Sequence, residues 1–282
     1  MFTIFVLMGK LKLCVIALTL AFFAVGCEKK EPNGLEIIKK RGFLQVAVSG
    51  DDPPFGYIDH RGKNQGFEVV FAKRLAYELF KDSSKIEFII VDPVSRFEVL
   101  KNGKADVVLA NFTNTPERAK IIDFAHPYMK VSISVVSPKI APIRDLSELA
   151  GKKLIVAKGT TQEKYFLEKH PEIEIMALNG IDEIFTALKD GRGAALAQDN
   201  TVAFVWAQED FNLEVGISSI GPVEGIAPAL KKGNTELLNF INKTIEELAE
   251  EQFFHKDFEA TLRAIMGPKA NPDDFVVEGG KL

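Results

Sequence analysis

Cysteine is scarce in this sequence, whose 282 residues include only Cys14 and Cys27. Cys14 lies inside an apolar run near the amino terminus, and such a run is removed when it belongs to a secretion signal. Cys27 would then be the only cysteine left, so no intramolecular disulfide is expected. The 256 residues from Cys27 onward are enough to build a buried core, which must then supply the stability.

Histidine is also sparse and forms no pattern. No two histidines have the spacing of metal ligands in motifs such as H-x-x-x-H, and none neighbours the polar motifs described below. No nucleophile elbow or Walker motif occurs either. We therefore expect no metal, no cofactor and no catalytic residue. The four histidines are His60, His126, His170 and His255.

A basic excess is also missing. The chain has 35 Lys and Arg residues against 39 Asp and Glu residues. Without Lys10 and Lys12 of the amino-terminal segment, 33 basic residues face 39 acidic ones, a net charge of −6. Proteins that bind nucleic acid carry a basic patch, so no nucleic-acid partner is expected.

Residues 1–26 have the pattern of a secretion signal. Lys10 and Lys12 precede an apolar run over 13–25, which is shorter than the roughly 20 residues of a membrane-spanning helix. Met8 is an alternative start that places the basic residues closer to the front. The sequence thus predicts export from the cytoplasm.

The end of this signal resembles the lipobox of bacterial lipoproteins. Small residues precede Cys27, although Ala24 replaces the usual leucine of that motif. Cys27 is then expected to carry lipid as the first mature residue, and the polar stretch 27–34 suits a flexible tether. The alternative is an ordinary signal peptide followed by an incidental cysteine.

The rest of the chain alternates strand and helix patterns, which predicts mainly parallel sheets covered by helices. A first cycle has strands at 43–48, 86–91 and 106–110, with helices at 66–80, 96–101 and from 115. A second cycle has strands at 153–157, 173–177 and 194–198, with helices at 161–170, 181–188 and 199–208. A strand near 226–230 and helices at 235–249 and 251–265 follow.

Two similar cycles joined by extended segments predict two lobes with a ligand cleft between them. Lobe one is expected to comprise 35–133 and 227–282, and lobe two 138–222. The hinge crossings are expected at 134–137 and 223–226.

Polar residues follow the predicted strands at three places where a helix begins. At the first, Thr115 and Pro116 suit a helix start. Arg118 would then lie in the first turn, where a cation opposes the helix dipole, so a bound anion would explain it. The alternative is an exposed arginine with a distant partner.

The second and third places lie in lobe two. Thr160 and Glu163 have capping-box spacing, and Thr161 beside them could bind an anion. Asp199 could cap its helix or accept hydrogen bonds from a ligand ammonium. Each is more often a simple helix cap, but together with Arg118 they match a zwitterion.

The chain from about residue 35 to 282 resembles the family 3 extracellular solute-binding proteins, the polar amino-acid binders of ABC importers. The segments 110–118, 159–161 and 198–199 carry the resemblance. It implies a two-lobed periplasmic-binding-protein fold of type II, in which Arg118 and Thr161 bind the α-carboxylate. It also implies that Thr113, the Asn111 carbonyl and Asp199 bind the α-amino group.

The similarity is most extensive to cysteine-binding members of the family, through segments such as 53–57, 64–66, 251–256 and 278–281. It therefore favours L-cysteine as the ligand. A dicarboxylic amino acid or glutamine is the alternative. The implied setting is a monomer in the periplasm, anchored by its lipid and working with an ABC permease and ATPase.

Asp52 stands where many members of the family have an aromatic ring. The ring contact would then be missing, or would come from Phe55, Tyr57 or Phe112, although such residues more often belong to a core. Arg96 has a counterpart that holds the ligand's side-chain carboxylate in some dicarboxylate binders. Pairing of Arg96 with Asp52 or Asp92 would cancel that preference.

An enzyme and a sensory domain are the alternatives to amino-acid capture. Some relatives of this family are dehydratases, but an enzyme needs a placed acid or base that the scattered histidines do not supply. A sensory ligand-binding domain is the other, and it would normally be followed by a membrane span or a catalytic region.

Overall fold

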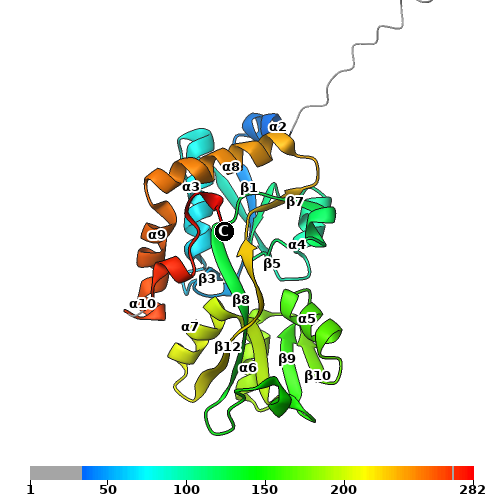
Figure 1. Ribbon diagram of the computed structural model, residues 1–282. Helices are drawn as coiled ribbons and strands as arrows, with labels where there is room; N and C mark the ends of the chain where they lie inside the picture. The colour runs from blue at the N-terminus through cyan, green and yellow to red at the C-terminus, as the bar shows by residue number, and fades with distance from the viewer. Residues whose placement is uncertain (1–33, 269) are drawn as a thin grey trace, which may run out of the picture. The chain divides into compact units, whose positions relative to one another are not determined.

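The computed structural model describes residues 34–268 and 270–282 (Figure 1). The predicted signal peptide, Cys27 and residues 27–33 of the predicted tether lie outside the described residues. Gly34, expected at the end of the tether, is instead the first residue of helix α2 (Gly34–Arg41). No helix in the described part of the chain is long and apolar enough to cross a membrane.

A five-stranded sheet with the order β5-β1-β6-β13-β7 forms the centre of lobe one. β1 pairs in parallel with β5 and β6, whereas β13 runs antiparallel to β6 and β7. β13, which comes late in the chain, is therefore an inner strand of this first sheet, between β6 and β7. The strands are β1 (Leu44–Ser49), β5 (Ile86–Val91), β6 (Val107–Leu109), β7 (Ile122–Phe124) and β13 (Ala229–Lys231).

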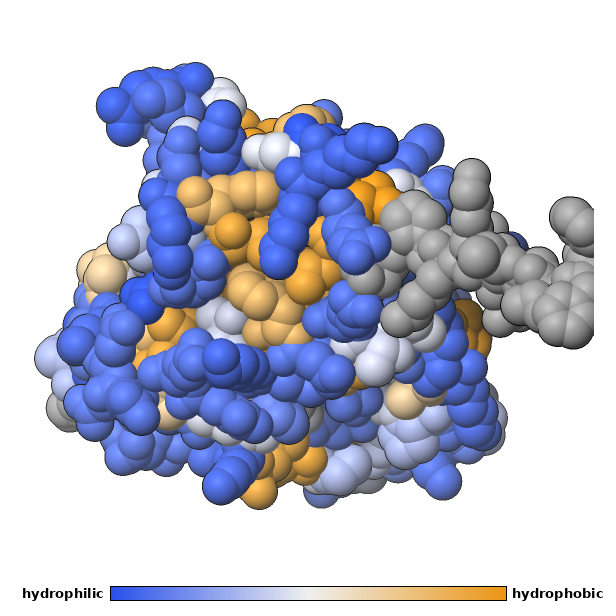
Figure 2. Space-filling view, turned by 90° about the horizontal axis from the view of Figure 1, so that it is seen from above, coloured by the Kyte–Doolittle hydropathy of each residue, from blue (hydrophilic) through white to orange (hydrophobic). Residues whose placement is uncertain are grey.

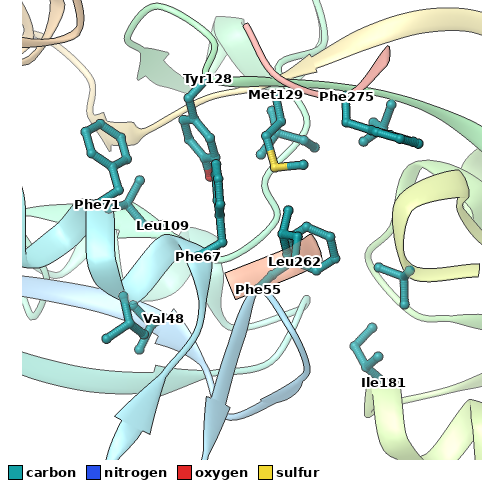
Figure 3. Close-up of a cluster of buried hydrophobic side chains, with 14 of the residues drawn as sticks. Val48, Phe55, Phe67, Phe71, Leu109, Tyr128, Met129, Ile181, Leu262 and Phe275 are labelled. Carbon is teal, nitrogen blue, oxygen red and sulfur yellow. The ribbon is translucent and has the colours of Figure 1, made fainter. Parts of the chain in front are cut away.

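Helix α3 (Phe67–Phe80) shows how the sequence pattern becomes packing. Phe67, Phe71 and Leu75 recur every four residues and are fully buried, as the pattern predicts. The Phe71 ring meets the rings of Tyr128 and Phe254 edge to face, at centroid distances of 5.3 and 4.9 Å. Figure 3 shows Phe67, Phe71 and Tyr128 in this cluster. This core supports the strands that carry the site.

The other helices of lobe one cover its sheet and one end. Figure 2 views the molecule from the end where α2 and α8 lie in Figure 1, and apolar residues there are framed by hydrophilic ones. Ile37 of α2 is half exposed. Besides α2 and α3, the helices of lobe one are α4 (Arg96–Lys101), α8 (Thr235–Glu250), α9 (Phe253–Asp257) and α10 (Arg263–Met266). A π-helical stretch, η3 (Phe258–Leu262), lies between α9 and α10.

A small antiparallel sheet, β2-β3-β4, follows β1 and lies beside α3. Its strands are too short to show a periodic pattern, and the sequence did not predict them. They place Asp51 and Asp52 directly after the carboxyl end of β1. The strands are β2 (Asp51–Asp52), β3 (Gly56–Ile58) and β4 (Asn64–Gln65).

Lobe two has its own five-stranded sheet, in the order β10-β9-β11-β8-β12. β9 pairs in parallel with β10 and β11, and β8 runs antiparallel to β11 and β12. The elements are β9 (Lys153–Ala157), β10 (Glu174–Leu178), β11 (Ala195–Asp199), α5 (Thr161–Lys169), α6 (Ile181–Lys189), α7 (Asn200–Glu209) and the 3₁₀ turn η2 (Leu146–Leu149). Two lobes built on mainly parallel sheets confirm the predicted fold class.

Two long antiparallel strands, β8 (Met129–Pro138) and β12 (Leu213–Ile226), connect the lobes. Residues 134–136, inside the predicted first crossing, pair with β11 within the sheet of lobe two. Met129 to Val131 pair with 224–226 at the lobe-one end of the same strands. Residues 134–136 thus belong to the sheet of lobe two, while the hinge crossings at 134–137 and 223–226 stay a prediction.

The carboxyl-terminal segment lies against the start of β8. Met129 forms an isolated antiparallel bridge with Val276, and the Lys130 amide donates to the Phe275 carbonyl at 2.8 Å. Two 3₁₀ turns, η4 (Pro272–Asp274) and η5 (Glu278–Gly280), flank this contact. The last residues of the chain therefore support the strand that leaves lobe one.

Two predicted helices differ from the structure. The helix expected from Thr115 is a single 3₁₀ turn, η1 (Arg118–Lys120), because the chain enters β7 two residues later and pairs with β13. The helix expected over 251–265 is divided into α9, η3 and α10. Both corrections come from tertiary contacts that override local propensity.

Candidate functional site

A small hollow, part of it open to solvent, lies between the two sheets at the carboxyl ends of their parallel strands. Both lobes contribute to its wall, as the predicted cleft requires. From lobe one come Ser49, Asp52, Pro93, Arg96, Ala110, Asn111, Thr113 and Arg118. From lobe two come Thr160, Thr161, Gln162, Ile181, Gln198 and Asp199.

Arg118 lies at the boundary of the lobes and is only 9% exposed. Its Nη1 donates to the Thr113 carbonyl at 2.9 Å, within lobe one. Its Nη2 donates to the Gly159 carbonyl of lobe two at 3.0 Å, so the lobes are in contact here. Because η1 is one 3₁₀ turn, the helix-dipole argument for this arginine was wrong. Burial lowers the pKa of Arg118 to about 10, which leaves it protonated at neutral pH.

Arg96 is more deeply buried than Arg118, at 4% exposure. Its Nε donates to the Pro93 carbonyl at 3.1 Å, and its Nη1 to the carbonyls of Ala110 and Asn111 at 2.9 and 3.0 Å. Burial, then the charge of Arg118, lowers the pKa of Arg96 to about 9. Most of its donors are therefore committed to backbone carbonyls.

The partners considered for Arg96 lie elsewhere. Asp92 accepts hydrogen bonds from the amides of Val94 and Ser95, and so caps the entry to α4. Asp52 receives a long hydrogen bond of 3.4 Å from the Asn111 side chain. Among the described residues, neither carboxylate forms an ion pair with Arg96 within 4.0 Å. The arginine is held by main-chain dipoles instead.

Phe112 and Phe55, both predicted as ligand contacts, are not part of the wall of the hollow. Phe112 is fully buried beneath the two guanidinium groups, whose carbon atoms lie 4.4 Å (Arg96) and 4.9 Å (Arg118) from its ring centroid. Phe55 is 1% exposed and belongs to the core cluster of Figure 3. Phe112 thus supports the arginines from behind through cation–π contacts.

A buried carboxylate network lies on the lobe-one side. Asn111 has a left-handed backbone (φ 48°), and its amide donates to Oε1 of Glu68 at 2.6 Å. The same oxygen accepts from the Tyr128 hydroxyl at 2.5 Å. Burial raises the pKa of Glu68 and raises that of Asp52 well above its usual range, with the charge of Glu68 adding to the shift in Asp52. Oδ1 of Asp52 is buried without a hydrogen-bond partner among the described residues.

The lobe-two side begins at the amino terminus of α5. Thr160 is its N-cap, and the Thr160 hydroxyl accepts from the Glu163 amide at 3.3 Å, which confirms the predicted cap. The Glu163 carboxylate accepts from the Gly159 amide at 2.7 Å, one residue earlier than in a standard capping box. Gly159 has φ +75° and approaches the Pro93 carbonyl closely, so a side chain there would be strained. Thr161 and Gln162 follow, at the wall of the hollow.

Asp199 occupies the N-cap position of α7, but its side chain makes no capping hydrogen bond. It turns instead to Gln162, whose Nε2 donates to Oδ1 of Asp199 at 2.7 Å. The side chain is 4% exposed, and burial raises the pKa of Asp199 to about 7. The simple helix-cap interpretation of Asp199 was wrong, because the carboxylate faces the hollow.

The wall therefore contains two guanidinium groups and two carboxylates, with a helix amino terminus beside them. Arg118, Thr161 and Asp199, which sequence analysis placed together, do meet at one site, and so do Asn111, Thr113 and Arg96. This set of charges can hold a small molecule that carries both an anionic and a cationic group.

Sequence reasoning missed some of the wall. Gln162 and Gln198 directly adjoin the predicted Thr161 and Asp199, and their place beside strand ends was an available signal. No sequence signal pointed to Ser49, Pro93 or Ile181, because their place in the wall depends on how the lobes meet. Asp52 was noted only as a departure from a pattern, and the structure puts it in the wall.

Comparison with known proteins agrees with this geometry. The family model described as bacterial extracellular solute-binding proteins, family 3, matches residues 44–259. The chain therefore belongs to the bacterial extracellular solute-binding proteins of family 3, which confirms the resemblance inferred from its motifs.

Solved structures extend the likeness. A solute receptor for L-cysteine from Neisseria gonorrhoeae is 46% identical, with a TM-score of 0.85 over 86% of this chain and 99% of the receptor. The cysteine-binding protein from Campylobacter jejuni is 44% identical, with a TM-score of 0.86 over 88% and 100% of the two chains. The ABC transporter glutamine-binding protein GlnH of Bacillus subtilis is 30% identical over 249 residues, 84% of this chain and 90% of that one.

Proposed function

We propose that this protein captures a free amino acid, L-cysteine in preference to others, for an ABC importer. The observation that carries the proposal is the meeting of Arg118 from lobe one with Thr161 and Asp199 from lobe two around one hollow. A ligand that touches both lobes favours the closed arrangement, because only a difference in contact free energy between two states can shift their populations.

The α-carboxylate is assigned to Arg118 and to the start of α5 at Thr161. A guanidinium group and free helix amides both favour an anion. Arg118 keeps donors beyond the two that bind the carbonyls of Thr113 and Gly159. The α-ammonium is assigned to Asp199, with the Asn111 carbonyl and Thr113 completing its surroundings. Each ligand charge then meets an opposite charge already held in place.

The preference for cysteine rests on the part of the wall that would face the ligand side chain. When it is ionised, Asp52 repels an acidic side chain, and Arg96 has most of its donors bound to carbonyls. Both features disfavour aspartate and glutamate. Neither Phe55 nor Phe112 offers a ring to stack on a longer side chain, which suits a short and weakly polar one. The two cysteine-binding neighbours described above point the same way.

Glutamine is the alternative, since a glutamine-binding protein is among the relatives. Competition calorimetry under reducing conditions, with cysteine, glutamine, aspartate, glutamate and arginine, distinguishes them. We expect the lowest Kd for L-cysteine. Tighter binding of another of these would refute the preference for cysteine, whereas binding of none would refute amino-acid capture itself.

We further propose that Cys27 anchors the protein to a membrane in the periplasm and that it works there as a monomer. The lipobox-like end of the apolar run supports the anchor. Cys27→Ser should move the protein from the membrane fraction to the soluble periplasmic fraction. Cys14→Ser is the matched control, since that residue would be lost with the signal. Membrane association unchanged by Cys27→Ser, without lipid mass on the mature terminus, would exclude the anchor.

A further inference from the structure

Helix α6 begins without a cap of its own. Its N-cap residue is Gly180, which has no side chain to accept a hydrogen bond from the first turn. The Ile181 amide nevertheless has an acceptor, because it donates to Oδ2 of Asp51 at 3.0 Å. Asp51 belongs to β2 of lobe one, whereas α6 belongs to lobe two. The helix is thus capped from across the cleft.

We propose that Asp51 is a closure latch, a carboxylate of lobe one that caps α6 of lobe two only when the cleft is closed. The inference rests on the proposed function, because it concerns how the same site retains its ligand. An N-cap interaction stabilises a helix end, and a carboxylate there also meets the positive end of the helix dipole. Opening the lobes returns the Ile181 amide to water, so this stabilisation belongs to the closed state.

The local geometry is suited to this contact. Asp51 is held in a short hairpin by its pairing with Tyr57. A Cβ at Gly180 would lie 3.2 Å from Oδ2 of Asp51, so a larger residue there would crowd the carboxylate. Glycine at the N-cap therefore keeps the approach open from the opposite lobe.

The latch lies directly beside the ligand site. Asp52, the next residue, and Ile181, the residue that is capped, both line the hollow. Figure 3 shows Ile181 at the start of α6 in the same view as Phe55 of lobe one. A ligand that draws these walls together brings the carboxylate and the amide into contact. Ligand binding and capping are then coupled through adjacent residues.

Other contacts across the cleft differ in kind. Glu117 and Lys164 form an ion pair at 3.4 Å, but their side chains are 59% and 46% exposed. Such exposed pairs contribute little in water. Asp182 lies near Asp51. Burial raises the pKa of Asp182, and the charge of Asp51 raises it further. This like charge opposes closure, and the hydrogen bond from the Ile181 amide to Asp51 acts against that repulsion.

Calorimetry and stopped-flow kinetics on the lipid-bearing mature protein, with L-cysteine under reducing conditions, test the latch. Asp51→Ala should raise the Kd about 2- to 30-fold, from the range measured for lost N-caps. The loss should appear as faster dissociation with little change in association, because the contact forms after encounter. Glu183→Gln is the matched control. Its carboxylate accepts from the Asn179 amide at the same helix end but within lobe two, so its Kd should not change.

A second background removes the donor instead of the acceptor. Ile181→Pro has no amide hydrogen at the first helical position, where proline is tolerated. In that background Asp51→Ala should have a much smaller effect on Kd, because only the interaction with the helix dipole remains. An equal effect of Asp51→Ala in both backgrounds would show that Asp51 acts by another route and would overturn the proposal. So would an unchanged dissociation rate for Asp51→Ala in the otherwise natural chain.

Hydrogen exchange at the Ile181 amide separates failure of the latch from failure of the proposed function. Exchange in the unsubstituted protein should slow when cysteine is added, and Asp51→Ala should remove that protection. If no amino acid binds, the proposed function fails on that result alone. The latch is then judged from exchange without ligand, where transient closure should make the Ile181 amide exchange more slowly than in Asp51→Ala, and equal rates would refute it.

Discussion

The pKa of Asp199 gives a quantitative prediction about binding. Burial raises that pKa to about 7, and the hydrogen bond from Gln162 only partly opposes the shift. Ionised Asp199 would therefore be about 3% of the population at pH 5.5 and about 76% at pH 7.5. An ammonium ligand needs the ionised form, and its charge lowers the pKa again once bound. Affinity should thus rise about tenfold to twentyfold from pH 5.5 to 7.5.

The sign follows from proton linkage. A ligand that lowers the pKa of Asp199 releases a proton on binding whenever the free protein is protonated, so binding strengthens as pH rises towards 7. The thiol of cysteine, with a pKa of about 8.5, stays about nine-tenths protonated up to pH 7.5, so its charge changes little over this range. Folding has the opposite dependence. Because the folded pKa lies above the unfolded one, the stability of the ligand-free protein should fall between about pH 4 and 7.

Isothermal titration calorimetry in buffers of different ionisation enthalpy measures both quantities. Near pH 6 the observed heat should depend on the buffer, with close to one proton released. Asp199→Asn should weaken binding and remove most of the pH dependence. Asp210→Asn is the control that should retain it, because Asp210 lies outside the wall of the hollow and its pKa is lowered by hydrogen bonds from Asn212. A Kd constant within twofold from pH 5.5 to 7.5, together with heats independent of buffer, would refute the assignment of the ammonium to Asp199.

Three further predictions concern binding and stability. Arg118→Ala should weaken amino-acid binding at least about a hundredfold, since charge-assisted hydrogen bonds contribute about 1.5 to 3 kcal/mol each, while circular dichroism stays unchanged; near-normal affinity by calorimetry would exclude its role. Burial raises the pKa of Asp257 to about 8, so in urea titrations Asp257→Asn should stabilise the fold by roughly 1 to 4 kcal/mol at pH 7 and by less at pH 4.5. Equal stabilisation at both pH values would contradict burial of this carboxylate as the reason. Burial lowers the pKa of His255, but hydrogen bonds to Asp273 and Glu278 outweigh it and leave that pKa raised. The same titrations should show His255→Gln about 0.5 to 1 kcal/mol less stable at pH 6, a loss that shrinks as pH rises through the folded pKa; a pH-independent loss would count against this ion-pair explanation.

Much of the fold was readable from local pattern because the long elements have strong periodicity. β5, α4 and β9 begin and end at the predicted residues, and α3 differs by one residue at its start. β5 and β9 are short runs rich in apolar and β-branched residues, and α3 repeats apolar residues every four positions, which is the information that local reasoning uses. The order of these elements was then enough to predict two α/β lobes.

What was missed depends on partners distant in the sequence. Thr115 and Pro116 have the signature of a helix start, yet pairing between β7 and β13 ends that turn after three residues. Arg96 binds backbone carbonyls, which no pattern of side chains can indicate. The short strands β2 to β4 carry too few residues for a period. The site residues could be grouped from sequence, but the carboxylate network behind Asn111 could not.

The path of the chain through its two lobes has a consequence for how specificity can change. Everything between β8 and β12, including Thr161 and Asp199, is one uninterrupted stretch, whereas Arg118 and Asp52 lie before it. An exchange of that stretch between relatives, with one join in each of the two paired strands, would replace half of the wall as a block. The other half, together with the tail that supports β8, would remain. New ligand preferences could therefore arise by combining two inherited halves as well as by single substitutions.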